Sequence, residues 1–253
     1  MKEADILPLL SQSTPHSIHV FPLLASTNLT LREMAEAGAP HGTAVIAEAQ
    51  TAGRGRLGRE FASPPEAGLY MSMLVRMPIP AASLGRMTPY AAVAAARAIE
   101  ATAAVQVGIK WVNDLRIGDR KIAGILTEGG FTPTGELAFG IVGIGVNLLP
   151  GALPPSLAGI AAAIGDHAVP PSREVLAAAI LDRFYRNLSE VTDGSFMEEY
   201  RRRSVVIGRT VTAQDAGRTV TGVATAIEDD GALRLATAEG EILLRAGEVS
   251  IRL

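Results

Sequence analysis

The chain has 253 residues, 48% of them hydrophobic and 19% charged, and no cysteine, which excludes disorder as the default along with disulfides, thiolate metal sites and thiol nucleophiles. The 23 Lys and Arg against 26 Asp and Glu give a net charge of -3, so a general attraction to polyanions is excluded and phosphate chemistry must be local. No run of about 18 apolar residues lacks a charge or a breaker, which predicts a cytoplasmic protein without membrane contact.

The first part of the chain alternates strand and helix patterns. Residues 26–38 predict a helix in which Ser26, Thr27 or Asn28 caps the start, Thr30 and Glu33 have capping-box spacing, and Gly38 provides the stop. The Ala-rich segment 83–103 gives the strongest helix signal and is expected to pack on a sheet. Strands are expected at residues 19–24, 42–50 and 68–77.

The second part begins with four strand candidates, and a turn at residues 118–120 predicts that the middle two form a hairpin. Helical patterns return at 172–191 and 195–203. From residue 204 the chain has short alternating strands separated by glycine turns, typical of an SH3-like β-barrel. We therefore expect an α+β fold with one domain at 1–203 and a small barrel at 204–253. The four strand candidates are 107–111, 114–118, 121–130 and 136–149.

The segment "AGRGRLGREF", residues 52–61, alternates glycine and arginine between two expected strands. Glycines let the backbone approach a ligand closely, and guanidinium groups bind carboxylate or phosphate bidentately, so the loop could capture one or two anions. A solvated surface loop and an RGG-like RNA-binding segment are the alternatives, although RGG segments are long and repetitive.

Three further segments carry polar groups that could act in a site. "KWVNDL" (110–115) offers Asp114 as a hard oxygen ligand for Mg²⁺ that bridges substrate phosphates, or it is an ordinary Asn-Asp turn. In "KIAGILTE" (121–128), Lys121 is either solvated after the turn or points into a pocket, where it would stabilise developing negative charge. "GIVGIGVNLL" (140–149) predicts a buried strand that Asn147 ends.

Together with "STN" at 26–28, the segments "QTAGRGRLGREF", "KWVNDL", "KIAGILTE" and "GIGVNL" resemble the biotin protein ligases in order and spacing. The resemblance implies a class II synthetase-like catalytic domain, a mixed sheet packed with helices, followed by the C-terminal barrel. It implies that biotin and MgATP give biotinyl-5′-AMP and pyrophosphate, and that a lysine of a biotin carboxyl carrier domain then takes the biotin. Only about 25 residues precede "STN", so the form without an N-terminal DNA-binding domain, and no specific DNA binding, is expected.

The resemblance also assigns residues to roles. Lys121 and Arg56 would be catalytic, and Asp114 would hold Mg²⁺. The nucleotide would be contacted by Arg56, Arg59, Phe61, Lys110, Asn113 and Asn147. Biotin would be contacted by Ser26, Thr27, Asn28, Gln50, Arg54, Gly55, Arg56, Lys121 and Gly124.

Two positions depart from the family pattern, and two other functions stay open. The family usually has proline at Val112 and tryptophan at Phe61, where a phenyl ring offers adenine a smaller face. A lipoate protein ligase would share the fold, but its "RRxSGGG"-like segment and following His-Asp pair are missing here. A nucleic-acid-binding protein using the "GRGR" patch is disfavoured by the acidic balance and by 4% aromatic residues. We also expect loop 52–61 to close over ligand, and a homodimer is possible through an exposed edge strand.

Overall fold

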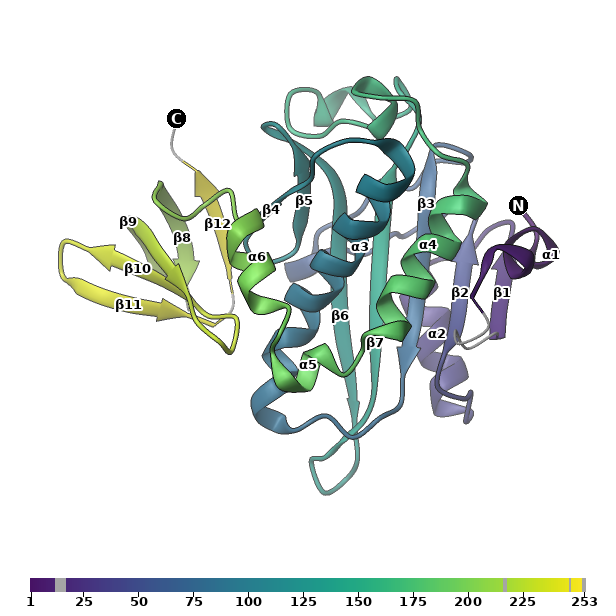
Figure 1. Ribbon diagram of the computed structural model, residues 1–253, viewed down its shortest axis with the longest axis horizontal. Helices are drawn as coiled ribbons and strands as arrows, with labels where there is room; N and C mark the ends of the chain where they lie inside the picture. Colours follow the sequence, from purple (N-terminus) through teal and green to yellow (C-terminus); the bar gives the residue numbers. More distant parts are fainter. Residues whose placement is uncertain (12–16, 216–217, 246, 252–253) are drawn as a thin grey trace.

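The computed structural model describes residues 1–11, 17–215, 218–245 and 247–251, and it contains a seven-stranded and a five-stranded sheet (Figure 1). The larger sheet runs in the order β1-β2-β3-β7-β6-β5-β4, with β1 and β2 parallel and every other pair antiparallel. The expected hairpin at residues 118–120 is confirmed, because β5 pairs with β6 across that turn. The strands of this sheet are β1 (Ser17–Phe21), β2 (Thr43–Ala47), β3 (Gly68–Val75), β4 (Gly108–Lys110), β5 (Asp114–Ile117), β6 (Arg120–Phe131) and β7 (Leu137–Asn147).

Helices cover the two faces of this sheet unequally. On one face α3 (Met87–Ala103) and α4 (Arg173–Arg186) pack side by side, and the alanines of α3 are buried because small side chains let the helix lie close to the strands (Figure 1). On the other face α2 (Thr27–Glu36) packs over β2, β3 and β7. Since α2 covers only part of that face, the rest is open to a ligand. The other helices are α1 (Glu3–Ile6), α5 (Glu190–Asp193), α6 (Met197–Arg203) and the short 3₁₀ turns η1 (Leu7–Leu9), η2 (Arg56–Gly58), η3 (Ala81–Arg86), η4 (Pro155–Leu157) and η5 (Ile164–Asp166).

Two local expectations were wrong. Thr30 lies inside α2 rather than at its start, so the Thr30 and Glu33 capping box does not form, and Ser26 is the N-cap residue. The helix expected at 172–191 ends at Arg186 and resumes as the short α5, because the chain turns at 187–189 to bring α6 against α3. Both errors come from tertiary contacts that overrule a local pattern.

The C-terminal part is a five-stranded antiparallel sheet, which confirms the expected all-β module. The strands of this sheet run in the order β11-β10-β9-β8-β12. The end of β9 and its connection to β10 are joined to the rest of the protein by hydrogen bonds, among them one from the β4–β5 turn and one from α6. Trp111 Nε1 donates to Gly231 O at 2.9 Å, and Arg201 Nε donates to Ile227 O at 2.7 Å. The division at residues 203 and 204 stays a prediction. The strands are β8 (Thr210–Asp215), β9 (Arg218–Ile227), β10 (Leu233–Thr237), β11 (Gly240–Leu244) and β12 (Glu248–Ile251).

A cluster of four charged side chains fastens α6 to α3. Arg203 donates to both carboxylate oxygens of Glu100, at 2.7 and 2.8 Å, and Arg97 Nη2 lies 2.6 Å from Glu199. Burial by itself raises the pKa of Glu100 and Glu199, but hydrogen bonds from Arg203 and Arg97 outweigh it and hold both pKa values below their usual range. The cluster therefore stabilises the fold while both carboxylates are ionised.

We expect Glu199→Gln to lower the free energy of unfolding at pH 7 by about 1 to 3 kcal/mol, since charge-assisted hydrogen bonds are lost. Because the folded pKa is depressed, this contribution is complete above the usual pKa of 4.5 and disappears as pH falls through the folded value. Urea unfolding between pH 7 and 3 measures it, with the exposed Glu136→Gln as control. Parallel pH curves for wild type and Glu199→Gln would contradict the prediction.

Candidate active site

One cavity of about 570 Å³ lies over the open part of the main sheet. Its floor comes from β3, β6 and β7, and its walls from the start of α2, the loop at 54–62, the β4–β5 turn and residues 153–161. Seven cationic side chains face three carboxylates there, although the whole chain is net negative. The cavity is therefore suited to anions. The charged lining residues are Arg54, Arg56, Arg59, Lys110, Arg116, Lys121, Arg209, Glu60, Asp114 and Asp119.

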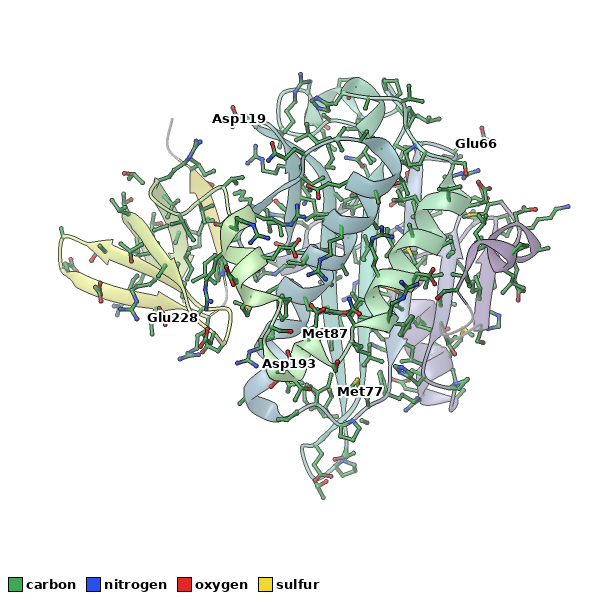
Figure 2. All side chains as sticks on the ribbon, viewed as in Figure 1. Glu66, Met77, Met87, Asp119, Asp193 and Glu228 are labelled. Atoms are coloured by element: carbon green, nitrogen blue, oxygen red, sulfur yellow. The ribbon has the colours of Figure 1, made fainter. Side chains whose placement is uncertain are left out.

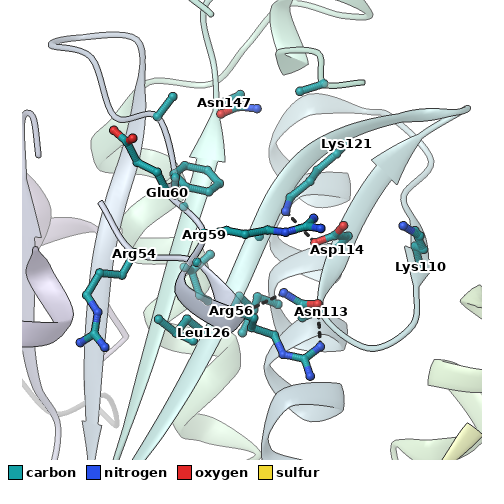
Figure 3. Close-up of a pocket in the computed structure, with 18 of the residues that line it drawn as sticks. Arg54, Arg56, Arg59, Glu60, Lys110, Asn113, Asp114, Lys121, Leu126 and Asn147 are labelled. Carbon is teal, nitrogen blue, oxygen red and sulfur yellow. Dashed lines mark hydrogen bonds and ion pairs between the residues drawn. The ribbon is translucent and has the colours of Figure 1, made fainter. Parts of the chain in front are cut away.

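The arginine-glycine loop is folded back on itself between β2 and β3. Gly55 N donates to Arg59 O at 2.7 Å and Phe61 N donates to Gly53 O at 2.9 Å. A Cβ on Gly53 would lie 2.3 Å from Phe61 O, so only glycine fits at that crossing. The narrow loop spreads its arginines around the cavity, as Figure 3 shows for Arg54, Arg56 and Arg59.

Lys121 reaches the cavity through an irregularity in β6. The partners of Leu115 and Arg116 are Ala123 and Lys121, so Ile122 is an extra residue in the pairing. Residues three apart on a regular strand point to opposite faces, and a bulge of one residue returns them to the same face. Accordingly, a Cβ on Gly124 would lie 3.0 Å from Lys121 Nζ. The bulge brings the ammonium group over the floor of the cavity.

Glycines leave that floor without side chains. Gly124 on β6 pairs with Gly145 on β7, and Gly143 follows on the same face. A Cβ on Gly145 would lie 2.5 Å from the Phe61 ring, and a Cβ on Gly143 would lie 2.2 Å from Asn28 Oδ1. An aromatic ring and an amide thus lie directly on the backbone, where a flat ligand group also fits.

A hydrogen-bonded group of polar side chains forms one end of the cavity. Gln50 Oε1 accepts from Thr27 N at 2.9 Å, so Gln50 caps α2 and leaves the side chain of Ser26 without a capping bond. Ser72 Oγ lies 2.6 Å from Asn28 Oδ1, and Asn28 Nδ2 donates to Glu128 Oε2 at 2.7 Å. These contacts fix the amide orientation of Asn28 in a buried position.

Three cations of the site are paired with groups of the protein itself. Lys121 Nζ lies 2.6 Å from Asp114 Oδ1, and Arg54 Nη1 lies 3.2 Å from Glu128 Oε1. Arg56 donates to Asn113 Oδ1 at 3.2 Å, and Figure 3 shows Arg59 directed at the Lys121–Asp114 pair. The carboxylates and the amide occupy positions that the oxygens of an anionic ligand can take.

The fold brings all of the residues expected in the site to this one cavity, from Ser26 on α2 to Asn147 at the end of β7. Lys121 lines this cavity, and its expected role in stabilising negative charge stays a prediction. Sequence reasoning missed Ser72, Glu128, Arg116 and the segment 153–161. Ser72 is one small residue in an otherwise apolar strand. The segment is held against the site by hydrogen bonds far apart in sequence, among them Lys121 N to Ile160 O at 3.0 Å and Ala162 N to Lys121 O at 2.9 Å.

Removing the Ser72 hydroxyl should affect stability because it leaves Asn28 Oδ1 buried without its donor. We expect Ser72→Ala to lower the free energy of unfolding by about 1 to 3 kcal/mol. Urea titration measures it, with Ser172→Ala at the N-cap of α4 as a matched hydroxyl removal expected to cost about 1 kcal/mol or less. A cost for Ser72→Ala below that of Ser172→Ala would contradict the prediction.

Comparison with known proteins identifies the families that match this chain. The biotin/lipoate A/B protein ligase family matches residues 20–147, and the biotin protein ligase C terminal domain matches residues 206–252. The bifunctional ligase/repressor BirA of Bacillus spizizenii is 42% identical over 126 residues, which cover 50% of this chain and 38% of BirA. The chain thus spans well under two thirds of that relative.

Two relatives align over most of their length. The biotin–[acetyl-CoA-carboxylase] ligase of Mycobacterium tuberculosis is 31% identical over 235 residues, covering 88% of this chain and 85% of that protein. The structure of the Aquifex aeolicus biotin protein ligase in complex with biotin and ATP superposes with a TM-score of 0.80 at 25% identity, covering 93% of this chain and 98% of that one. With both of its regions matched in this order, the chain belongs to the biotin/lipoate A/B protein ligase family.

Proposed function

We propose that the protein is a biotin protein ligase that activates biotin with ATP and transfers it to a lysine of a carrier domain. The observation that carries the proposal is one cavity with a buried polar end at Asn28 and Gln50, a cationic middle at Lys121 and Arg56, and an aromatic ring on a bare floor at Phe61. A ureido ring, a carboxylate beside a phosphate, and adenine match these three parts in turn.

The polar end supports biotin over lipoate. A ureido group has two N–H donors and one carbonyl acceptor, which suit the hydroxyl of Ser26 and the amide of Asn28 in a buried setting. The dithiolane ring of lipoate offers none of these hydrogen bonds. It would gain nothing from the polar groups at this end, whereas biotin would form hydrogen bonds with them, and a site built to hydrogen-bond its substrate discriminates against an analogue that lacks those groups.

In the first step a biotin carboxylate oxygen attacks the α-phosphorus of ATP, and the bond to the bridging oxygen breaks as pyrophosphate leaves. Two anions about 4 Å apart repel by about 4 kcal/mol at an effective dielectric of 20, so the cations must be placed in advance. Lys121 lies between the floor and Asp114, and Arg56 approaches from the loop. They would exchange their protein partners for the reacting oxygens.

In the second step the neutral amine of the acceptor lysine attacks the carbonyl carbon of the mixed anhydride. The bond from that carbon to the phosphate oxygen breaks, AMP leaves with the electron pair, and the amine loses a proton. Lys121 and Arg56 would again hold the phosphate as it gains charge. A carrier domain of a carboxylase is the acceptor that the family resemblance implies.

Mg²⁺ fits this site only as a partner of the nucleotide. Among the described residues there is no group of three or more His, Cys, Asp or Glu side chains that could hold a metal ion. Mg²⁺ commonly binds through one or two carboxylates plus substrate phosphates, and Asp114 is placed to give such a carboxylate. When bound, the ion would neutralise charge on the phosphates that leave.

Three sequence expectations are not decided by the fold. Among the residues that the structure describes, no helix is long and apolar enough to cross a membrane. A cytoplasmic location, the lack of specific DNA binding, and pairing of two copies through an edge strand stay predictions.

The test of the proposed function is ATP–pyrophosphate exchange with Mg²⁺ and biotin, lipoate or no acid. Exchange that depends on biotin alone is expected. Exchange with lipoate but not biotin would replace the proposal by its nearest alternative, and no exchange with either acid would refute acid activation.

Lys121→Ala should slow biotin-dependent exchange by about 10² or more, the usual order for removing a preorganised charge partner. The chain offers a matched control in Lys2→Ala, because Lys2 is exposed and distant from the cavity. Calorimetric titration with biotin alone checks that the ureido end is intact. Near-normal exchange by Lys121→Ala would remove Lys121 from the mechanism.

Loop 52–61 should become resistant to trypsin when biotin and ATP are both present. Its tip is accessible in the ligand-free structure, where Leu57 is 71% exposed, and ligand anions would draw its arginines inward. Mass spectrometry of limited digests measures cleavage after Arg54, Arg56 and Arg59 against cleavage at the exposed Arg218 in the barrel. Equal slowing at all four sites would argue against a specific closure.

A further inference from the structure

A second cavity, of about 620 Å³, lies where the main sheet meets the C-terminal module. It is bounded by the ends of α3 and α6, the start of β4, the β5–β6 turn and β12. Asp119, at the tip of that turn, marks the side of the main sheet that faces the module (Figure 2). Arg203 of α6 and Glu100 of α3, which are hydrogen-bonded to each other, form one wall of the cavity.

The charge of this cavity is not balanced. Its lining has four arginines and two carboxylates. Glu100 is engaged through both oxygens by Arg203, so the remaining carboxylate is Asp119. In the part of the chain that the structure describes, the side chains of Arg116, Arg202 and Arg209 have no hydrogen-bond or ion-pair partner. Three unpaired guanidinium groups beside one space favour an anion with several oxygens.

Arg116 is the most constrained of the three. Its Nε atom is buried without any hydrogen-bond partner, and it is the only such side-chain atom among the described residues. Leaving a buried donor of a charged group without a partner is costly, and a bound ligand that accepts from Arg116 Nε would remove that cost. Removing water from Arg116 in advance also strengthens its attraction for an anion.

The two cavities are neighbours that share part of their lining. Arg116, Asp119, Arg209 and Ile251 line both of them. Arg116 is paired directly with Lys121 across β5 and β6, and side chains opposite each other on neighbouring strands lie about 5 Å apart at their Cβ atoms. A phosphate chain whose first phosphate lies at Lys121 would therefore meet Arg116 next and the second cavity after it.

We propose that the second cavity receives the pyrophosphate released in the first step, with Arg116 as its first contact and Arg209 and Arg202 beyond it. The proposal rests on the proposed ligase function, because that function supplies the leaving group. Pyrophosphate would leave at the junction with the C-terminal module. The mouth of the first cavity, where the arginine loop closes, would stay available to the acceptor lysine.

Calorimetric titration with pyrophosphate, AMP and inorganic phosphate tests this directly on the full chain. Arg116→Ala should weaken pyrophosphate binding about 10-fold or more, the loss expected for a charge-assisted hydrogen bond, while AMP binding stays within about twofold. Arg209 is exposed, and its side chain makes no hydrogen bond or ion pair within the described residues, so Arg209→Ala tests the same prediction with little risk to folding. Arg218→Ala, in the C-terminal module away from both cavities, is the matched control.

The outcomes separate this proposal from the ligase function. If biotin-dependent exchange is present but both variants bind pyrophosphate as wild type does, the second cavity is not its site. Equal weakening of AMP and pyrophosphate would place Arg116 in the first cavity only and would also overturn the proposal. Absence of biotin-dependent exchange would refute the ligase function, whereas the pyrophosphate titration would still report on the cavity.

Discussion

The structure of the site depends on holding seven positive side chains around the first cavity in a chain whose net charge is negative. Like charges at close range repel, and three of these cations have a partner in the protein before a ligand arrives. The protein provides Asp114 for Lys121, Glu128 for Arg54 and Asn113 for Arg56. Asp114 and Glu128 lie on strands of the sheet and Asn113 lies in the β4–β5 turn, so the cations are held in place and an anion that binds would only need to exchange with these partners.

The rest of the site keeps those positive charges close to sheet backbone that carries no side chains. Gly124 and Gly145 leave no side chain between the sheet and its ligand, and the extra residue in β6 turns Lys121 onto the same face. The buried Ser72–Asn28–Glu128 contacts then link the polar end of the cavity to the partner of Arg54. The polar end of the cavity and the arginine loop are therefore connected through one carboxylate, that of Glu128.

The C-terminal module has a place in the same arrangement. Trp111, next to Lys110 in the site segment, donates to Gly231 of the module, and Arg209 and Ile251 of the module line the first cavity. The junction thus forms part of the wall of the first cavity. The second cavity, with Arg116 between it and Lys121, gives that junction a role beyond holding two sheets together.

The sequence by itself determined the α+β class, the hairpin at 118–120, the C-terminal all-β module and four of the segments that line the cavity, because strand alternation, glycine turns and short motifs are local properties. It did not determine that Gln50 caps α2, that Glu128 holds Asn28 and Arg54, or that Ile122 is the extra residue in β6. Those depend on which strands pair and in what register. Arg116 looked like an ordinary strand residue, and only the tertiary structure placed it, unpaired, between two cavities.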